Sequence, residues 1–271
     1  MTQLAGLEHL YVNGVALWSE RLPGWERARR ILAGVEPAPT EPAPRPSPEL
    51  LPPNERRRAP DTVAVALHAA LAACKSAGLA PGSLASVFSS MHGDLGITDY
   101  MCTTMASTPT LVSPTRFHNS VHNAAAGYWT IGAECMRPYT ALSAGEQSFG
   151  AGLLETCVQA RSTGENVLLV AYDIDARGAL APMARSKHVL ASALVIGPEP
   201  GTNVLAHFDM MLIAEAGLTA STARPENAAL VAGNSSEACL PFMEALARGG
   251  AQQILCLATP TLGLEIRLQG V

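Results

Sequence analysis

One stretch, residues 139–164, limits what the whole chain can fold into. Tyr139 to Ser143 is predicted to be a short strand, Gly145 supplies a tight turn, and a helix is predicted to begin near Ser148. Small residues around the turn let one backbone segment pass close to another. This order predicts an α/β protein with its functional groups at a helix N-terminus, where unpaired N–H groups favour negative charge.

The composition agrees with a buried α/β sheet. Hydrophobic residues make up 48% of the 271 residues and charged residues 15%, which suits one sizeable core or two closely packed halves. The net charge is −5, and the main basic run is 56–58, so nucleic acid is not an expected partner. These arginines are expected on a solvated face; the alternative is a docking patch for an acidic carrier protein.

Cysteine usage and the N-terminus bear on the compartment. The six cysteines stand singly, without Cys-x-x-Cys pairs, which predicts buried thiols rather than a disulfide framework. The N-terminus has no basic region followed by an apolar run, and no apolar stretch approaches transmembrane length. We therefore expect a cytoplasmic protein without membrane insertion.

Periodicity and turn residues predict the elements outside the turn region. The helix over 61–77 has Asp61 as its expected N-cap and Gly78 as its stop signal. The first half is predicted to hold a strand over 7–18, a helix over 25–32, a proline-rich loop over 36–53, a strand over 84–90, a helix over 97–107 and strands over 166–172 and 188–196. The remainder is predicted to hold a segment over 203–213, a helix over 237–248 and strands over 254–258 and 264–268.

Several motifs in a fixed order resemble the thiolase-like condensing enzymes, specifically the β-ketoacyl synthases. They are Ser89-Ser-Met-His-Gly-Asp-Leu-Gly96, Val112-Ser-Pro-Thr-Arg-Phe117, Asn119-Ser-Val-His-Asn-Ala-Ala-Ala-Gly-Tyr-Trp129, the turn at 144–152, and Gly164-Glu165 before a strand. The resemblance runs from about Leu51 to Val195. It implies a layered α/β/α/β/α fold, with a synthase-like N-terminal half over 1–197 and a truncated second half over 198–271 packed on it.

The residues that carry condensation chemistry in that family are missing. Counting by the family's spacing puts the catalytic cysteine at Gln147 from one side and at Glu146 from the other, and neither is a thiol. The chain also lacks a His-Gly-Thr motif and has no histidine after His207. The resemblance therefore implies that no catalytic residue is intact and that no cofactor is needed.

What the resemblance implies is a chain-length-factor-like subunit, similar to those of aryl-polyene and xanthomonadin-type clusters. Such a subunit pairs with an active ketosynthase in a heterodimer, receives an acyl carrier protein, and shapes the acyl tunnel of polyketide or fatty-acid-like biosynthesis. Two alternatives stay open. One is a stand-alone enzyme, either a malonyl-thioester decarboxylase or a hydrolase; the other is a homodimeric scaffold that binds acyl carriers.

The hydrolase alternative depends on the order Ser148, then Asp173 or Asp175, then His188, which is that of α/β-hydrolases. However, Gly145 stands three residues before Ser148 rather than two, which favours a helix cap for Ser148.

Further candidate residues belong to the tunnel, the partner interface or a metal site. Met101, Cys102 and Met105 are expected to pack in the core; the alternative, which the resemblance implies, is that they line the acyl tunnel together with Thr98 on the same helix face. The tunnel and interface set is completed by Asn123 and Phe149. His118 and His122 have the i, i+4 spacing of metal ligands, but no Glu lies between them, so capping and packing are expected and no metal.

Overall fold

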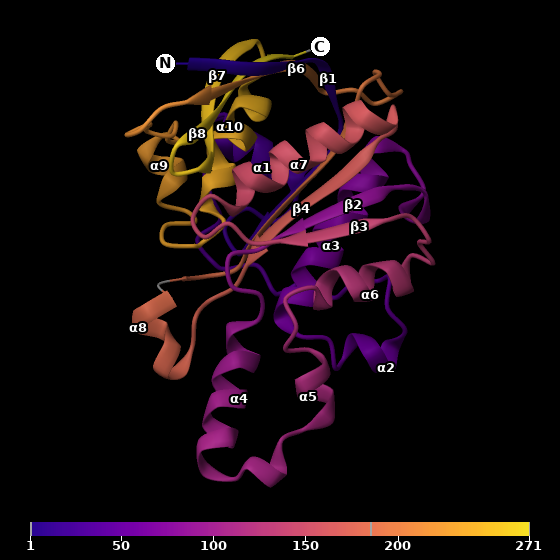
Figure 1. Cartoon of the computed structure of the whole chain (residues 1–271), viewed down its shortest axis with the longest axis vertical. Coiled ribbons are helices and arrows are strands. Elements are labelled where there is room, and N and C mark those ends of the chain that lie inside the picture. Colours follow the sequence, from indigo (N-terminus) through magenta and orange to yellow (C-terminus); the bar gives the residue numbers. More distant parts are fainter. Residues whose placement is uncertain (1, 185, 271) are drawn as a thin grey trace.

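The computed structural model describes residues 2–184 and 186–270, whose strands join in one sheet of eight (Figure 1). The strand order is β3-β2-β4-β5-β1-β6-β8-β7. The strands are β1 (Thr2–Ser19), β2 (Ala85–Ser89), β3 (Tyr139–Leu142), β4 (Val167–Asp173), β5 (Leu190–Gly197), β6 (Ala206–Ala214), β7 (Ala251–Thr259) and β8 (Leu262–Gly270). Strands β3, β2 and β4 run parallel, and the other neighbours in the sheet are antiparallel.

Helices connect these strands and cover the sheet. They are α1 (Trp25–Leu32), α2 (Pro53–Arg56), α3 (Asp61–Ala77), α4 (Leu95–Ser107), α5 (Pro114–His118), α6 (Ala124–Gly132), α7 (Ser148–Thr163), α8 (Ala181–Ala184), α9 (Pro225–Ala228) and α10 (Leu240–Arg248). No helix in the described part of the chain has the length and apolar character needed to cross a membrane.

Two hydrophobic clusters lie on opposite faces of the sheet. The first, which we call the α3 cluster, joins α3 and α6 to β2, β4 and β5 through residues such as Leu67, Trp129 and Leu168. The second, the α7 cluster, packs helices α1, α7 and α10, with residues such as Leu153 and Phe242, against inward residues of β1, β2 and β4 to β8. Successive residues of a strand face opposite sides of the sheet, so a strand such as β4 contributes residues to both clusters.

Helix α7 lies between two parts of the sheet. A side chain at Gly152 would come within 2.9 Å of Ser89 at the end of β2, and one at Gly150 would clash with the carbonyl oxygen of Leu257 on β7. Residues two apart on a helix point about 200° apart, so β2 and β7 pack on nearly opposite sides of α7. From one side to the other, the layers are helices α3 and α6, the part of the sheet that contains β2, helix α7, and the curled end of the sheet with β7.

This arrangement confirms the α/β class and the thiolase-like layered fold with a shortened second half. The strands of the second half do not form a sheet apart, because β6 pairs directly with β1. Division of the chain at residue 197 stays a prediction.

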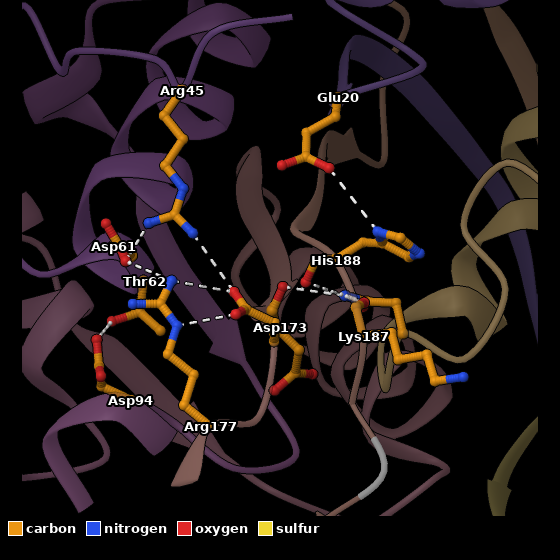
Figure 2. Close-up of polar contacts among 11 residues, drawn as sticks. Glu20, Arg45, Asp61, Thr62, Asp94, Asp173, Arg177, Lys187 and His188 are labelled. Carbon is orange, nitrogen blue, oxygen red and sulfur yellow. Dashed lines mark hydrogen bonds and ion pairs between the residues drawn. The ribbon is translucent and has the colours of Figure 1, made fainter. Parts of the chain in front are cut away.

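Several predicted elements have the bounds that the sequence indicated, and others moved. Helices α1 and α3 match the predictions, and Gly78 ends α3 with a left-handed φ of 69°. Pro60, rather than Asp61, is the N-cap of α3. Asp61 instead pairs with Arg45 and with Arg177, which fastens the proline-rich loop to α3 (Figure 2).

Candidate functional site

The turn before α7 is held by one side chain. The hydroxyl of Ser148 donates to the carbonyl of Gly145 (2.6 Å) and accepts from the amide of Ala144 (3.0 Å), while Gly145 takes a φ of 60°. Ser148 is buried and is the first helical residue, and Gln147 is the N-cap. The predicted start of the helix is thus confirmed, with Ser148 bracing the turn rather than capping the helix.

Gln147 and Glu146 face a large cavity at this helix end. The cavity has a volume of about 720 Å³ and lies between the start of α7, the segment 220–241 and β7. Neither Gln147 nor Glu146 has a side-chain hydrogen-bond partner among the described residues. The amides of Phe149 and Gly150 in the first turn of α7 are likewise without a described partner, as is usual for a helix N-terminus.

A buried carboxylate ties one wall of the cavity to the strand ends. Asp173, at the end of β4, is 1% exposed and accepts hydrogen bonds from the hydroxyls of Ser90 (2.8 Å) and Ser236 (2.7 Å). It also accepts from the amides of Met91 (3.1 Å) and His92 (3.3 Å). Burial raises the pKa of Asp173, and these four donors oppose that shift.

Asn234 completes the same wall. Its side-chain amide donates to the carbonyls of Asp173 (3.2 Å), Lys187 (2.9 Å) and His188 (3.1 Å), and the last two residues lie in the loop before β5. Its side-chain oxygen accepts from the amide of Ser236 (2.9 Å). The segment 233–237 of the second half is therefore fixed to the ends of β2 and β4 of the first.

The three side chains of the hydrolase alternative do not come together. Asp173 accepts hydrogen bonds from serine hydroxyls and backbone amides and has none from an imidazole ring, and the hydroxyl of Ser148 is bonded within its own turn. Asp175 pairs with Arg45 and Arg177. His188 lies 3.8 Å from Glu20 with its side chain 57% exposed (Figure 2). A Ser-His-Asp relay needs hydrogen bonds between its members, so this geometry does not support a Ser148 hydrolase.

The two histidines with ligand spacing are also separate. His118 is the last residue of α5 and is exposed, whereas His122 lies in the following turn and bonds the carbonyl of Ser90 (2.8 Å). Within the described residues, no group of three metal-binding side chains is found.

The predicted tunnel residues divide between two places. Helix α4 projects from the sheet with α5 (Figure 1); there Met105 is 53% exposed, Cys102 is exposed and Met101 is buried. None of these, nor Thr98, lines the cavity, which Phe149 does. Asn123 donates to the hydroxyl of Tyr139 (3.0 Å) at the start of β3. A role for these residues in a tunnel or interface stays a prediction.

One residue on the cavity escaped the sequence analysis. Cys256 on β7 is 5% exposed and lines the cavity near Phe149 and Gly150. Burial raises the pKa of its thiol to about 12, so almost none is thiolate at neutral pH and it is a poor nucleophile. Only the curl of the sheet around α7 brings residue 256 here, and nothing in the local sequence signals it.

The chain matches a family model over residues 25–258, and that model describes the N-terminal domain of β-ketoacyl synthases. Among curated proteins, no sequence matches the chain.

Solved structures share the fold. A chain of the complex between the ketosynthase ApeO and its chain length factor ApeC, from Xenorhabdus doucetiae, has a TM-score of 0.72 at 21% identity, with 96% of this chain and 99% of that chain covered. A chain of AntDE:AntF, a type II acyl-carrier protein in complex with its ketosynthase, has a TM-score of 0.72 at 8% identity, covering 97% and 99%. For the bacillaene module 1 ketosynthase from Bacillus amyloliquefaciens FZB42, the TM-score is 0.54 at 11% identity, and the match covers 80% of this chain and 48% of that one.

Proposed function

Because the chain belongs to the β-ketoacyl synthase N-terminal domain family, we propose that it acts as a non-catalytic, chain-length-factor-like subunit. It pairs with an active ketosynthase that works with an acyl carrier protein, and it shapes the acyl tunnel of an aryl-polyene-type or related pathway. The observation that carries the proposal is the carboxamide at the start of α7: Gln147 is the N-cap residue of this helix and lines the cavity.

The carboxamide of Gln147 cannot replace a thiolate as the nucleophile. Condensation needs a nucleophile that holds the acyl chain as a thioester, together with groups that stabilise an enolate. Among the described residues that line the cavity there is no histidine, and the one thiol is Cys256, which burial keeps protonated. The same absence disfavours decarboxylation by this chain alone.

The free edge of the sheet offers the surface for pairing. β3 is the outermost strand beside β2, and exposed apolar side chains surround it, including Ile131 (74% exposed), Met136 (96%) and Tyr139 (40%). Apolar patches of this kind mark protein interfaces, and an exposed strand edge is a template for pairing with another strand. The exposed Met105 and Phe117 on the α4–α5 projection add a second apolar contact.

The backbone hydrogen bonds of β3 identify a residue whose substitution tests pairing at this edge. The amides of Ser86 and Ser90 donate to the carbonyls of Pro138 (3.1 Å) and Leu142 (3.2 Å), so alternate residues bond β2 and Ala141 directs its N–H outward. Proline at Ala141 removes that outward donor while leaving the bonds to β2 intact.

The test is co-expression of the full chain with a candidate ketosynthase from the same organism, followed by size-exclusion chromatography with light scattering. We expect a 1:1 heterodimer, weakened at least tenfold by Ala141→Pro and unchanged by Ala141→Thr, which keeps the N–H. A stable homodimer that ignores the synthase would instead favour the scaffold alternative. Thioester turnover by the isolated chain, lost on Gln147→Ala, would overturn the proposal in favour of an enzyme.

A further inference from the structure

The outer edge of β7 lies at the opposite end of the sheet from β3 and is only partly covered. We propose that its open half binds an extended peptide of a partner protein as an added strand, with an acidic side chain of that peptide placed beside Arg248. This inference goes beyond the proposed function, because pairing with a synthase is assigned to the β3 edge.

The edge of β7 is paired at one residue and open at two others. The amide of Leu255 donates to the hydroxyl of Ser221 (2.9 Å), and the amide of Ser221 donates to the carbonyl of Leu255 (2.9 Å). Leu255 thus directs its backbone groups outward, and because this direction alternates along a strand, Ala251 and Gln253 direct theirs outward too. Neither has a described hydrogen-bond partner on that side. Two N–H and two C=O groups therefore remain for an added strand.

A hollow of about 170 Å³ lies beside the open half of this edge. Helix α10 contributes residues 241, 244, 245 and 248 to its lining, a spacing that puts them on one face of the helix. Strand β7 contributes residues 252–254, and residues 221–222 complete the lining. A peptide residue level with Gln252 in an added strand points to the same face of the sheet as Gln252 does. Its side chain therefore enters the hollow.

The charges at the hollow select an acidic side chain. Among the described lining residues, the charged ones are Glu244 and Arg248. Arg224 engages both carboxylate oxygens of Glu244, through its side-chain Nε (2.6 Å) and its backbone amide (2.9 Å). The side chain of Arg248 is half exposed, and its guanidinium comes within only 4.0 Å of Glu244. Arg248 can therefore pair with a carboxylate of a bound peptide, at the modest strength of exposed ion pairs.

Fluorescence anisotropy of the full chain tests the inference with three labelled, amidated peptides. They are Val-Thr-Glu-Thr-Val and the same sequence with Gln or Lys at its centre. The β-branched residues favour an extended peptide, and each sequence reads the same in both directions. We expect the Glu peptide to bind about threefold more tightly than the Gln peptide, and the Lys peptide to bind most weakly.

Variants of the chain separate the backbone contribution from the charge. Gln253→Pro removes an outward N–H and leaves the bonds between β7 and β8 intact, so it should weaken all three peptides about fivefold or more. Gln253→Thr keeps the N–H and should not weaken them. Arg248→Glu should reverse the preference, so that the Lys peptide binds more tightly than the Glu peptide. Arg161→Glu, at an exposed position of α7 away from the hollow, should leave the order unchanged.

The inference is overturned if the folded chain binds none of the peptides, if Gln253→Pro leaves their affinity unchanged, or if Arg248→Glu does not reverse the preference. A dimer of the isolated chain that Gln253→Pro separates in light scattering would also overturn it, because a second copy would then occupy the edge. These results are distinguishable from a failure of the proposed function, which Ala141→Pro tests at the other edge. A chain that pairs with its synthase but binds no peptide loses only this inference.

Discussion

The two parts of the sheet differ in how many faces they bury. Every residue of β2, β4 and β5 is buried, whereas β6, β7 and β8 alternate between buried and more exposed positions. The α3 cluster contains no buried residue from the last three strands. Their outward positions carry polar groups instead, among them Asp209, Glu265 and Arg267. The last three strands therefore pack one face against α7 and leave the other face more accessible to water.

The comparison teaches how a shortened half stays folded. Its inward residues, such as Phe208, Ile254 and Ile266, complete the α7 cluster, and β6 extends the sheet from β1. A strand face that no helix covers is compatible with a stable fold where it carries polar side chains.

The largest expected effect comes from placing lysine on the same sheet face in each part. Leu168 on β4 is fully buried in the α3 cluster, and Met211 on β6 is partly exposed. Leu168→Lys should lower the free energy of unfolding by more than about 4 kcal/mol, because it buries an unpaired charge. Met211→Lys should change it by less than about 1 kcal/mol. Urea denaturation followed by circular dichroism measures both, and equal losses would contradict the comparison.

Thiol labelling tests whether Cys256, on the inward face of β7, is protected from reagents in solution. Burial raises the pKa of Cys256 from 9.0 to about 12, which lowers its thiolate fraction about a thousandfold at pH 8. Iodoacetamide should therefore modify the exposed Cys102 and leave Cys256 unmodified in the folded chain, as mass spectrometry would show. In Cys102→Ser, rapid labelling should disappear; rapid labelling of Cys256 would indicate an open, reactive site.

The packing of α7 between the two parts predicts opposite results for two glycines. Gly150→Ala places a methyl group against the carbonyl of Leu257 and should destabilise the chain by about 2–3 kcal/mol. Gly127→Ala in α6 meets nothing within 4 Å and should stabilise it by about 0.4–1 kcal/mol, because alanine loses less backbone entropy. Thermal melts of the two variants give the comparison, and a neutral Gly150→Ala would argue against the tight α7–β7 contact.

The last comparison concerns Asp173, which links the segment 233–237 to the ends of β2 and β4. Asp173→Asn puts an amide group among four donors and should cost about 1–3 kcal/mol.

The pH dependence of that cost follows from the raised pKa of Asp173. A carboxyl whose pKa is higher in the folded state than its ordinary 3.8 contributes stability while protonated, and that contribution is lost as the pH rises through the folded pKa. The advantage of the native chain over Asp173→Asn should thus shrink from about pH 4 upward. Urea titrations at several pH values measure it; an advantage that grows with pH would mean that the donors outweigh burial.

Much of the fold was predictable because local patterns decide local structure. Apolar spacing with Gly78 as a stop predicted α3, the turn at Gly145 predicted the start of α7, and the apolar run after Gly164 predicted β4. The N-cap of α3 was wrong because Asp61 takes part in ion pairs with Arg45 and Arg177, which lie far away in the sequence.

By itself, the sequence determined the α/β class, the order of most elements, the family resemblance and the absence of a thiol at Glu146 and Gln147. Only the tertiary structure decided that the last strands join the first sheet, that Cys256 and the segment 220–241 meet the start of α7, and that Ser148, Asp173 and His188 stay apart. The physical reason is range. Turns and helices follow from neighbouring residues, whereas the cavity depends on how far the sheet curls around α7, which side-chain packing between distant segments sets.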